Sequence, residues 1–324
     1  MRGRSTILMM VLRVGAFAAC VQLVVAFPIA AGAQQPAAPG AQAPASPAAP
    51  AAQAPGRGRG PQPVDSRVQI RMHHFADTNE EIPYALFVSS KVKRNAKAPL
   101  IVTLHGLGGT HTTMMRPNAI DLAEAGGYIL LAPMGYNPRG WFGAPAPQGR
   151  GRRGATPPPA QGQAPAQAPQ AQAPPAPAPG GAANDPPNLR ELSEKETLQV
   201  IDLVRKEFTI DDDRTYVMGH SMGGAGTLYL AMKYPQRWAA AAAIAPAAFT
   251  VDTQGLAKVP KMPFMIVHGD ADTVVPPGVG RAWAEAMKSL NMNYQFIEVP
   301  GGDHGTVISS HQAEIFAFFA KHSR

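Results

Sequence analysis

Short runs of apolar residues alternate with longer amphipathic segments through most of the chain. Each apolar run is bounded by glycine, proline or polar residues, and the runs lie at 99–106, 127–133, 214–220, 240–246, 263–269 and 294–300. Continuous apolar runs of this length are typical of strands that are buried on both faces of a parallel sheet. Two earlier runs, 67–75 and 82–89, predict an antiparallel edge of the same sheet.

Helical patterns fill the gaps between these runs, at 117–125, 189–208, 222–234, 277–290 and 307–322. Along the longest of them, a mainly apolar stripe interrupted by charges predicts a helix with one side on a sheet; it contains Leu192, Leu198, Ile201, Val204, Arg205 and Phe208. The alternation of strands and helices predicts an α/β fold, with a mainly parallel, twisted sheet and helices on both faces.

Two segments interrupt this pattern. Residues 34–63 and 144–183 consist almost entirely of Ala, Pro, Gln and Gly, with too little bulky apolar surface to offset the entropy of ordering. We predict a disordered linker at 34–63 and a disordered insertion at 144–183, within one folded domain that spans 64–324.

The first 33 residues carry the three parts of a secretory signal. These are an apolar run at 14–30, a small-residue cleavage motif at 31–33, and the basic residues Arg2, Arg4 and Arg13. We therefore predict a signal peptide over 1–33 and a protein that is exported, to the periplasm or beyond the cell. An uncleaved membrane anchor is an alternative, although the run is short for a span of about 20 residues.

Cys20 is the only cysteine, and it lies inside the predicted signal peptide. Its "FAAC" context resembles a poor lipoprotein attachment site, so lipid anchoring is an alternative that we do not expect. Cleavage after Ala33 would leave no cysteine for a disulfide or a thiolate metal site. It would also remove three arginines and lower the formal charge of +7 to about +4. The remaining basic residues are scattered, so we expect no nucleic-acid partner.

The stretch "GHSMGGAG" at 219–226 places a serine between glycines, where a strand gives way to a helix. In this context Ser221 is predicted to occupy a sharp, strained turn that exposes its hydroxyl group. Side chains at Gly219 or Gly223 would collide with the adjoining strand or helix. We interpret His220 as a packing residue, because it points away from the exposed side of such a turn.

A serine nucleophile needs a base and an acid that orients it. "HGDADTVVP" at 268–276 supplies Asp270 and Asp272 after one strand, and "PGGDHGTV" supplies His304 after the next, with Asp303 as a further candidate for the acid. Carboxyl ends of parallel strands meet at one edge of the sheet, so these groups are expected to converge there.

Backbone amides are expected to form an oxyanion hole. The amide of Met222 follows the serine at a helix N-terminus, where amides point outward. The second is the amide of Leu107 in "LHGLGG" (104–109), a strand-end loop in which glycines let the backbone approach a substrate oxygen.

In this order and spacing, "LHGLGG", "GHSMGG", "HGDADTVVP" and "GGDHGT" resemble the α/β-hydrolase superfamily. The similarity is greatest to its compact carboxylesterase, feruloyl esterase and polyhydroxybutyrate depolymerase-like members, which overlap with dienelactone hydrolases and prolyl-oligopeptidase catalytic domains. It covers 64–324 except the insertion. The resemblance implies that Ser221 is the nucleophile, His304 the base and Asp272 the acid, with Asp270 a structural turn residue.

The predicted function is cleavage of carboxylic esters through an acyl-enzyme intermediate, without a metal or organic cofactor. The segment after 240–246 is too short for a large cap domain, so the cleft should be open to a small-molecule or polymer-attached ester. Trp141, in "GYNPRGWFG", is a possible substrate contact, and it could equally cover the core. His73 and His74 point to opposite faces of a strand, which is poor geometry for one metal ion.

Two other functions remain open. A serine peptidase of the prolyl-oligopeptidase type would use the same catalytic parts. A non-catalytic envelope-associated protein would use the Ala/Pro-rich segments as its working part and the folded body as a scaffold.

Overall fold

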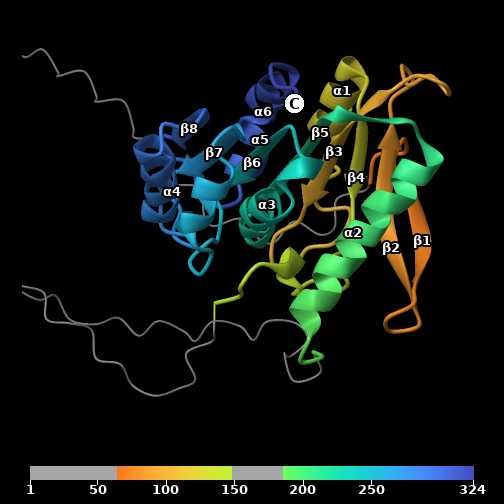
Figure 1. Cartoon of the computed structure of the whole chain (residues 1–324), viewed down its shortest axis with the longest axis horizontal. Coiled ribbons are helices and arrows are strands. Elements are labelled where there is room, and N and C mark those ends of the chain that lie inside the picture. The colour runs from red at the N-terminus through yellow and green to blue at the C-terminus, as the bar shows by residue number, and fades with distance from the viewer. Residues whose placement is uncertain (1–63, 148–184) are drawn as a thin grey trace, which may run out of the picture. The chain divides into compact units, whose positions relative to one another are not determined.

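The computed structural model describes residues 64–147 and 185–324, whose strands form one eight-stranded sheet (Figure 1). The strands are β1 (Gln69–Phe75), β2 (Glu80–Val88), β3 (Ala98–Leu104), β4 (Ile129–Ala132), β5 (Ile210–His220), β6 (Ala240–Ile244), β7 (Phe264–Gly269) and β8 (Tyr294–Val299). Their order across the sheet is β1-β2-β4-β3-β5-β6-β7-β8. Only β2 runs antiparallel to its neighbours, so the prediction of a mainly parallel sheet with an antiparallel edge is confirmed.

Helices cover both faces of this sheet, as predicted. They are α1 (Pro117–Gly126), α2 (Leu189–Glu207), α3 (Met222–Lys233), α4 (Gly278–Ser289), α5 (Val307–Ser310) and α6 (Gln312–Ala320). Successive side chains of a strand point to opposite faces, so Val102 packs in a core with α2, α3 and α4, whereas Ile101 packs in a core with α1 and α6. These two apolar cores fix the position of the sheet, and with it the loops at the carboxyl ends of its strands.

Only a short 3-10 helix, η4 (Thr253–Lys258), lies between β6 and β7. The structure thus has no large cap domain within residues 64–147 and 185–324, and the fold class is the one predicted. No helix in these two ranges is long and apolar enough to cross a membrane.

The predicted helix at 307–322 is interrupted, because His311 has φ −128° and ψ 31°. The break separates α5 from α6, so that Ile308 faces the cleft described below while Phe316 and Phe319 pack against the sheet. The strand β5 begins earlier than predicted, at Ile210, which pairs with Ala98 beyond an irregularity in register.

The buried face of α2 differs from the predicted stripe. It includes four polar side chains, Ser193, Glu194, Glu196 and Thr197, whereas Leu198 is only half-buried. The apolar periodicity could not predict this, because Ser193, Glu194 and Glu196 have partners in distant parts of the chain, whereas Thr197 bonds to the oxygen of Ser193 within the helix.

Several predictions concern residues outside those that the structure describes. These are the signal peptide at 1–33, with Cys20, the linker at 34–63, and most of the insertion at 144–183. At the start of the predicted insertion, Ala144 is buried and its amide donates to the oxygen of Trp141, over 2.8 Å. The folded body therefore continues past residue 143.

Candidate active site

Ser221 occupies the single residue between the end of β5 and the start of α3. Its φ of 56° and ψ of −114° are strained for a residue other than glycine, and such strain costs about 1–3 kcal/mol. The Ser221 amide donates to the oxygen of Ile244 on β6, which fixes the turn over the sheet edge.

Both glycines around this serine are sterically required. A Cβ atom at Gly219 would lie 2.4 Å from the oxygen of Gly223, and one at Gly223 would lie 2.2 Å from the oxygen of Leu104. A side chain at Gly219 or Gly223 would therefore force β5, α3 and the end of β3 apart.

The loops after β7 and β8 bring an acid and a base together. The Nδ1 atom of His304 lies 2.7 Å from Oδ2 of Asp272, whose side chain is fully buried. The other oxygen, Oδ1, accepts hydrogen bonds from the amides of Val274 and Val275, at 2.8 and 2.9 Å. Burial acts to raise the pKa of Asp272, but hydrogen bonds from His304 and from these two amides outweigh it, so that the pKa is lowered.

The other two candidate acids accept hydrogen bonds from backbone amides in the loop after β8. Asp270 accepts the amide of Gly301 at 2.6 Å, and Asp303 accepts the amides of Gly305 and Thr306. The geometry thus places Asp272, and neither Asp270 nor Asp303, against the imidazole of His304.

Ser221 and His304 line the same cleft, together with Leu107 and Met222. In the described part of the chain, no hydrogen bond joins the Ser221 hydroxyl to the His304 ring. Catalytic hydrogen bonds are often long in the absence of substrate and shorten when it binds. Likewise, the amides of Leu107 and Met222 donate no hydrogen bond to a described residue, which leaves both N–H groups for a ligand.

The cleft has a volume of about 530 Å³ and a mainly apolar wall. Among the described residues that line it, only His220 and His304 carry an ionisable side chain; the others include Leu107, Trp141, Met222, Ala247, Phe249, Val274, Val275 and Ile308. At its mouth, Leu107, Phe249 and Val274 are 60%, 50% and 64% exposed. Trp141 both lines the cleft and packs against the core, so the two readings of this residue are compatible.

His220 has a contact that the sequence did not predict. Its Nε2 atom donates to the backbone oxygen of His304 over 2.8 Å, and the two imidazole centroids lie 4.6 Å apart. Burial, followed by the nearby His304, lowers the pKa of His220 to about 4, so its ring is neutral near pH 7.

His105, in the loop after β3, is almost fully buried. Its ring nitrogens face the oxygens of Gly106 and Met134, at 2.8 and 3.0 Å. Burial lowers the pKa of His105, so the neutral ring donates to only one of these oxygens at a time.

Metal binding has no support among residues 64–147 and 185–324, where no group of three or more His, Cys, Asp or Glu side chains could hold an ion. His73 is buried against Glu196, at 3.1 Å, and His74 is exposed and lies near Glu81. The two histidines thus face apart.

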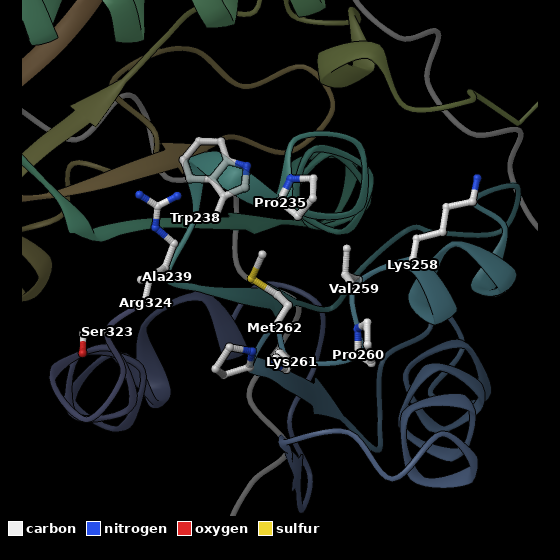
Figure 2. Close-up of a pocket in the computed structure, with 11 residues that line it drawn as sticks. Pro235, Trp238, Ala239, Lys258, Val259, Pro260, Lys261, Met262, Ser323 and Arg324 are labelled. Atoms are coloured by element: carbon white, nitrogen blue, oxygen red, sulfur yellow. The ribbon is translucent and has the colours of Figure 1, made fainter.

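A second cavity, of about 570 Å³, lies at the opposite edge of the sheet (Figure 2). Its walls come from the segments that precede β6 and β7, around Trp238 and Met262, and from the C-terminal residues Ser323 and Arg324. Ligands of open α/β sheets bind at the carboxyl ends of the strands, so the cleft at Ser221 is the better candidate active site.

A family model described as phospholipase/carboxylesterase matches residues 185–323, which include Ser221, Asp272 and His304. A search of curated proteins finds no match to this sequence.

Solved structures with the same fold include esterases and a peptidase. A thermostable esterase superposes with a TM-score of 0.55 and 23% identity over 80% of this chain, which spans 64% of that protein's length. A ferulic acid esterase from Anaeromyces mucronatus, solved with ferulic acid, gives 0.55 and 16%, over 79% of this chain and 90% of that one. A putative dipeptidyl aminopeptidase IV from Bacteroides ovatus gives 0.52 and 15%, over 79% and 36%. The chain thus has the α/β-hydrolase fold, and its residues 185–323 match the phospholipase/carboxylesterase family.

Proposed function

We propose that this protein is a serine hydrolase that cleaves uncharged, mainly apolar carboxylic esters. The observation that carries the proposal is the Asp272–His304 pair, held at 2.7 Å beside the strained turn of Ser221 in one cleft. The family match and the esterases among the structural neighbours support the same reaction class.

In the acylation step, the Oγ atom of Ser221 attacks the ester carbonyl carbon while its proton passes to Nε2 of His304. Asp272 holds the imidazole through Nδ1 and stabilises the imidazolium that forms. The amides of Leu107 and Met222 donate to the oxyanion of the tetrahedral intermediate. The C–O bond to the alcohol then breaks, and the alcohol leaves with the proton from His304.

The acyl-enzyme is hydrolysed by the reverse use of the same groups. His304 removes a proton from water, the resulting hydroxide attacks the acyl carbon, and the acid leaves as the proton returns to Ser221. This route uses no metal ion or organic cofactor.

The cleft suggests the kind of ester. The part of the wall that residues 64–147 and 185–324 supply has no carboxylate, ammonium or guanidinium side chain to pair with a charged substrate group, and burying an unpaired charge is costly. The exposed apolar rim and the lack of a large cap among the described residues suit a substrate that is bulky or attached to a polymer. Trp141 is proposed to contact the acyl or aromatic part of that substrate.

A peptidase of the prolyl-oligopeptidase type is the second candidate, favoured by the structural likeness to the Bacteroides ovatus protein. The same triad would attack an amide. The described lining of the cleft is less suited to it, because none of those residues offers an acidic side chain for a peptide N-terminus. A non-catalytic envelope-associated protein is the third candidate.

The sequence pattern of residues 1–33 supports the further proposal that the protein is exported. N-terminal sequencing of the protein recovered outside the cytoplasm should then begin at Gln34. A mature protein that retains Met1 or carries a lipid on Cys20 would contradict cleavage after Ala33, and recovery of the protein only from the cytoplasm would contradict export.

The decisive experiment measures hydrolysis of p-nitrophenyl esters of increasing chain length, methyl ferulate and a prolyl anilide, with Ser221→Ala as control. Ester turnover that falls by several orders of magnitude in Ser221→Ala is expected. Turnover of the anilide alone would support the peptidase. No turnover, together with no labelling of Ser221 by a fluorophosphonate, would support the non-catalytic role.

A further inference from the structure

A buried carboxyl group lies outside the catalytic centre, on the helix α2. The side chain of Glu196 is 0% exposed, and its Oε1 atom lies 3.1 Å from Nε2 of His73 on β1. Neither residue lines the cleft. Removing a carboxyl group from water is costly unless all its oxygens are satisfied, so a specific structural role is the expected reason for its presence.

The second oxygen of Glu196 holds a left-handed turn. Oε2 accepts the amide of Gly135 at 2.7 Å and the amide of Tyr136 at 3.2 Å. These two residues have φ of 66° and 65°, and consecutive backbone amides in such turns form a concave anion-binding site. A left-handed conformation is unfavourable for a residue such as tyrosine, and the two hydrogen bonds from the turn to Glu196 offset that cost.

The segment that begins with this turn leads to the proposed oxyanion loop. The oxygen of Pro138 accepts the amide of Gly108 at 3.0 Å, and Gly108 follows Leu107 directly in the chain. In addition, the buried ring of Phe142 packs edge-on against the ring of His105, with centroids 5.1 Å apart. The segment 135–142 thus touches the oxyanion loop at two points.

An ion pair also holds the segment 135–142 in place. The guanidinium of Arg139 forms two hydrogen bonds with the carboxylate of Asp185, at 2.6 and 2.7 Å. This pair is partly exposed, so it is expected to contribute less than the buried contacts of Glu196.

We propose that Glu196 is a positioning residue that sets the place of the Leu107 amide through the turn at 135–136 and the Pro138–Gly108 hydrogen bond. It touches no reacting atom. The expected effect on the reaction rate rests on the proposed function. The structural coupling between Glu196 and the Gly108 amide does not, because hydrogen exchange measures it without any enzymatic activity.

Three variants of Glu196 separate its contacts. Glu196→Gln keeps an oxygen for the two amides of the turn and should stay within about 3-fold of the wild type. Glu196→Asp draws the carboxyl group back by one methylene, and Glu196→Ala removes it. The matched control is Thr197→Val, which deletes a fully buried hydrogen bond to the oxygen of Ser193 on the same helix without touching the turn.

The kinetic readout is the split between kcat and KM. Loss of an oxyanion-hole donor costs about 10²–10³ in rate, so a displaced donor should lower kcat by about 10- to 100-fold in Glu196→Ala and less in Glu196→Asp, with KM within about 3-fold. The Ki of a trifluoromethyl ketone, whose adduct with Ser221 places an oxyanion in the same site, should rise in proportion. Thr197→Val should leave kcat, KM and the Ki of the trifluoromethyl ketone at their wild-type values.

The structural readout is hydrogen exchange of the Gly108 amide, followed by NMR. Exchange at Gly108 should be faster in Glu196→Ala and Glu196→Asp, and unchanged in Glu196→Gln and Thr197→Val. Should Glu196→Ala fail to fold, Glu196→Asp decides alone.

If hydrogen exchange at Gly108 is unchanged in folded Glu196→Asp, the proposed coupling between Glu196 and Gly108 is wrong, whatever the activity of the variant. Faster exchange with an unchanged kcat would overturn the positioning role. If the wild type has no hydrolase activity, the proposed function fails, and the exchange measurement still decides the link.

Discussion

His220 and His304 are joined by a hydrogen bond from the imidazole of one to the backbone of the other. Nε2 of His220 donates to the oxygen of His304 over 2.8 Å, and the rings lie at 4.6 Å. His220 ends β5 and His304 follows β8, so the bond connects the strand before Ser221 to the loop that carries His304. The residue before the proposed nucleophile thereby helps to place the proposed base.

Replacing His220 by leucine should therefore loosen the His304 loop. We expect kcat to fall about 10-fold with little change in KM, because a small misplacement of a catalytic group is costly in rate. His220→Gln, whose side-chain amide can donate to the same oxygen, should recover most of the loss. Wild-type kcat in His220→Leu would show that the hydrogen bond has no positioning role.

Replacing Asp272 by asparagine should remove most activity. The amide cannot stabilise an imidazolium and favours the wrong tautomer of His304, which typically costs about 10³–10⁴ in kcat. Asp270→Asn is the matched control, because among the described residues Asp270 accepts only the amide of Gly301 in the loop after β8, a bond that the asparagine oxygen can keep, and the variant should stay within a few-fold of the wild type. Equal losses in both variants would contradict the assignment of Asp272 as the acid.

Much of the fold could be predicted because its signals are local. The runs at 99–106 and 263–269 carry their own apolar pattern, and both became buried strands, β3 and β7. The need for glycine at positions 219 and 223 could also be predicted, because the backbone atoms around a sharp turn at Ser221 leave no room for a side chain. The break at His311 was missed because the sequence 307–322 has no glycine or proline to mark it.

The surroundings of the site could not be read in this way. The helical pattern at 189–208 does not mark Glu196 as buried, and its burial depends on His73, which lies 123 residues away in the sequence. Phe249 and Val274 reach the cleft from separate loops that carry no periodic pattern. The choice between Asp270 and Asp272 needed a family resemblance, because both follow the same strand.

Gly223 should not tolerate a methyl group. A Cβ there would lie 2.2 Å from the Leu104 oxygen, so Gly223→Ala should lower the free energy of unfolding by about 1–3 kcal/mol and displace the oxyanion loop. Gly278→Ala is the control, because a Cβ at Gly278 meets no atom within 4 Å at the start of α4, and it should be neutral or slightly stabilising. Urea unfolding measures both variants, and equal stability of the two would contradict the steric argument.

Trp141 should set the preference for the acyl or aromatic group. Trp141→Ala removes a large apolar wall of the cleft, so kcat/KM should fall about 10-fold or more for long-chain and aromatic esters and change little for acetyl esters. Leu290→Ala serves as control, since Leu290 is an exposed apolar residue after α4 and outside the cleft. An equal fall for all esters would indicate that Trp141 supports the fold and does not select the substrate.

Acid should destabilise the protein well above the pH at which most carboxylates titrate. The pKa of His220 is lowered to about 4 in the folded protein, against an ordinary value of 6.5, so the folded state favours the neutral ring. Between pH 6.5 and pH 4 the His220 imidazole is therefore protonated in the unfolded chain and neutral in the folded protein. The stability that neutral His220 contributes is therefore fully present above pH 6.5 and is lost as the pH falls toward 4.

The size of the effect follows from the shift. Its upper bound is about 3 kcal/mol between pH 7 and pH 4, since each pKa unit corresponds to about 1.4 kcal/mol. The lowered pKa of Asp272 acts in the same sense, but only near and below its ordinary value of 3.8. His220→Gln has no group to titrate at this position, so its free energy of unfolding should fall less steeply between pH 6.5 and 4.5 than that of the wild type. Urea unfolding at pH 7.5, 5.5 and 4.5 compares the two slopes, and identical slopes would show that His220 does not carry the acid sensitivity.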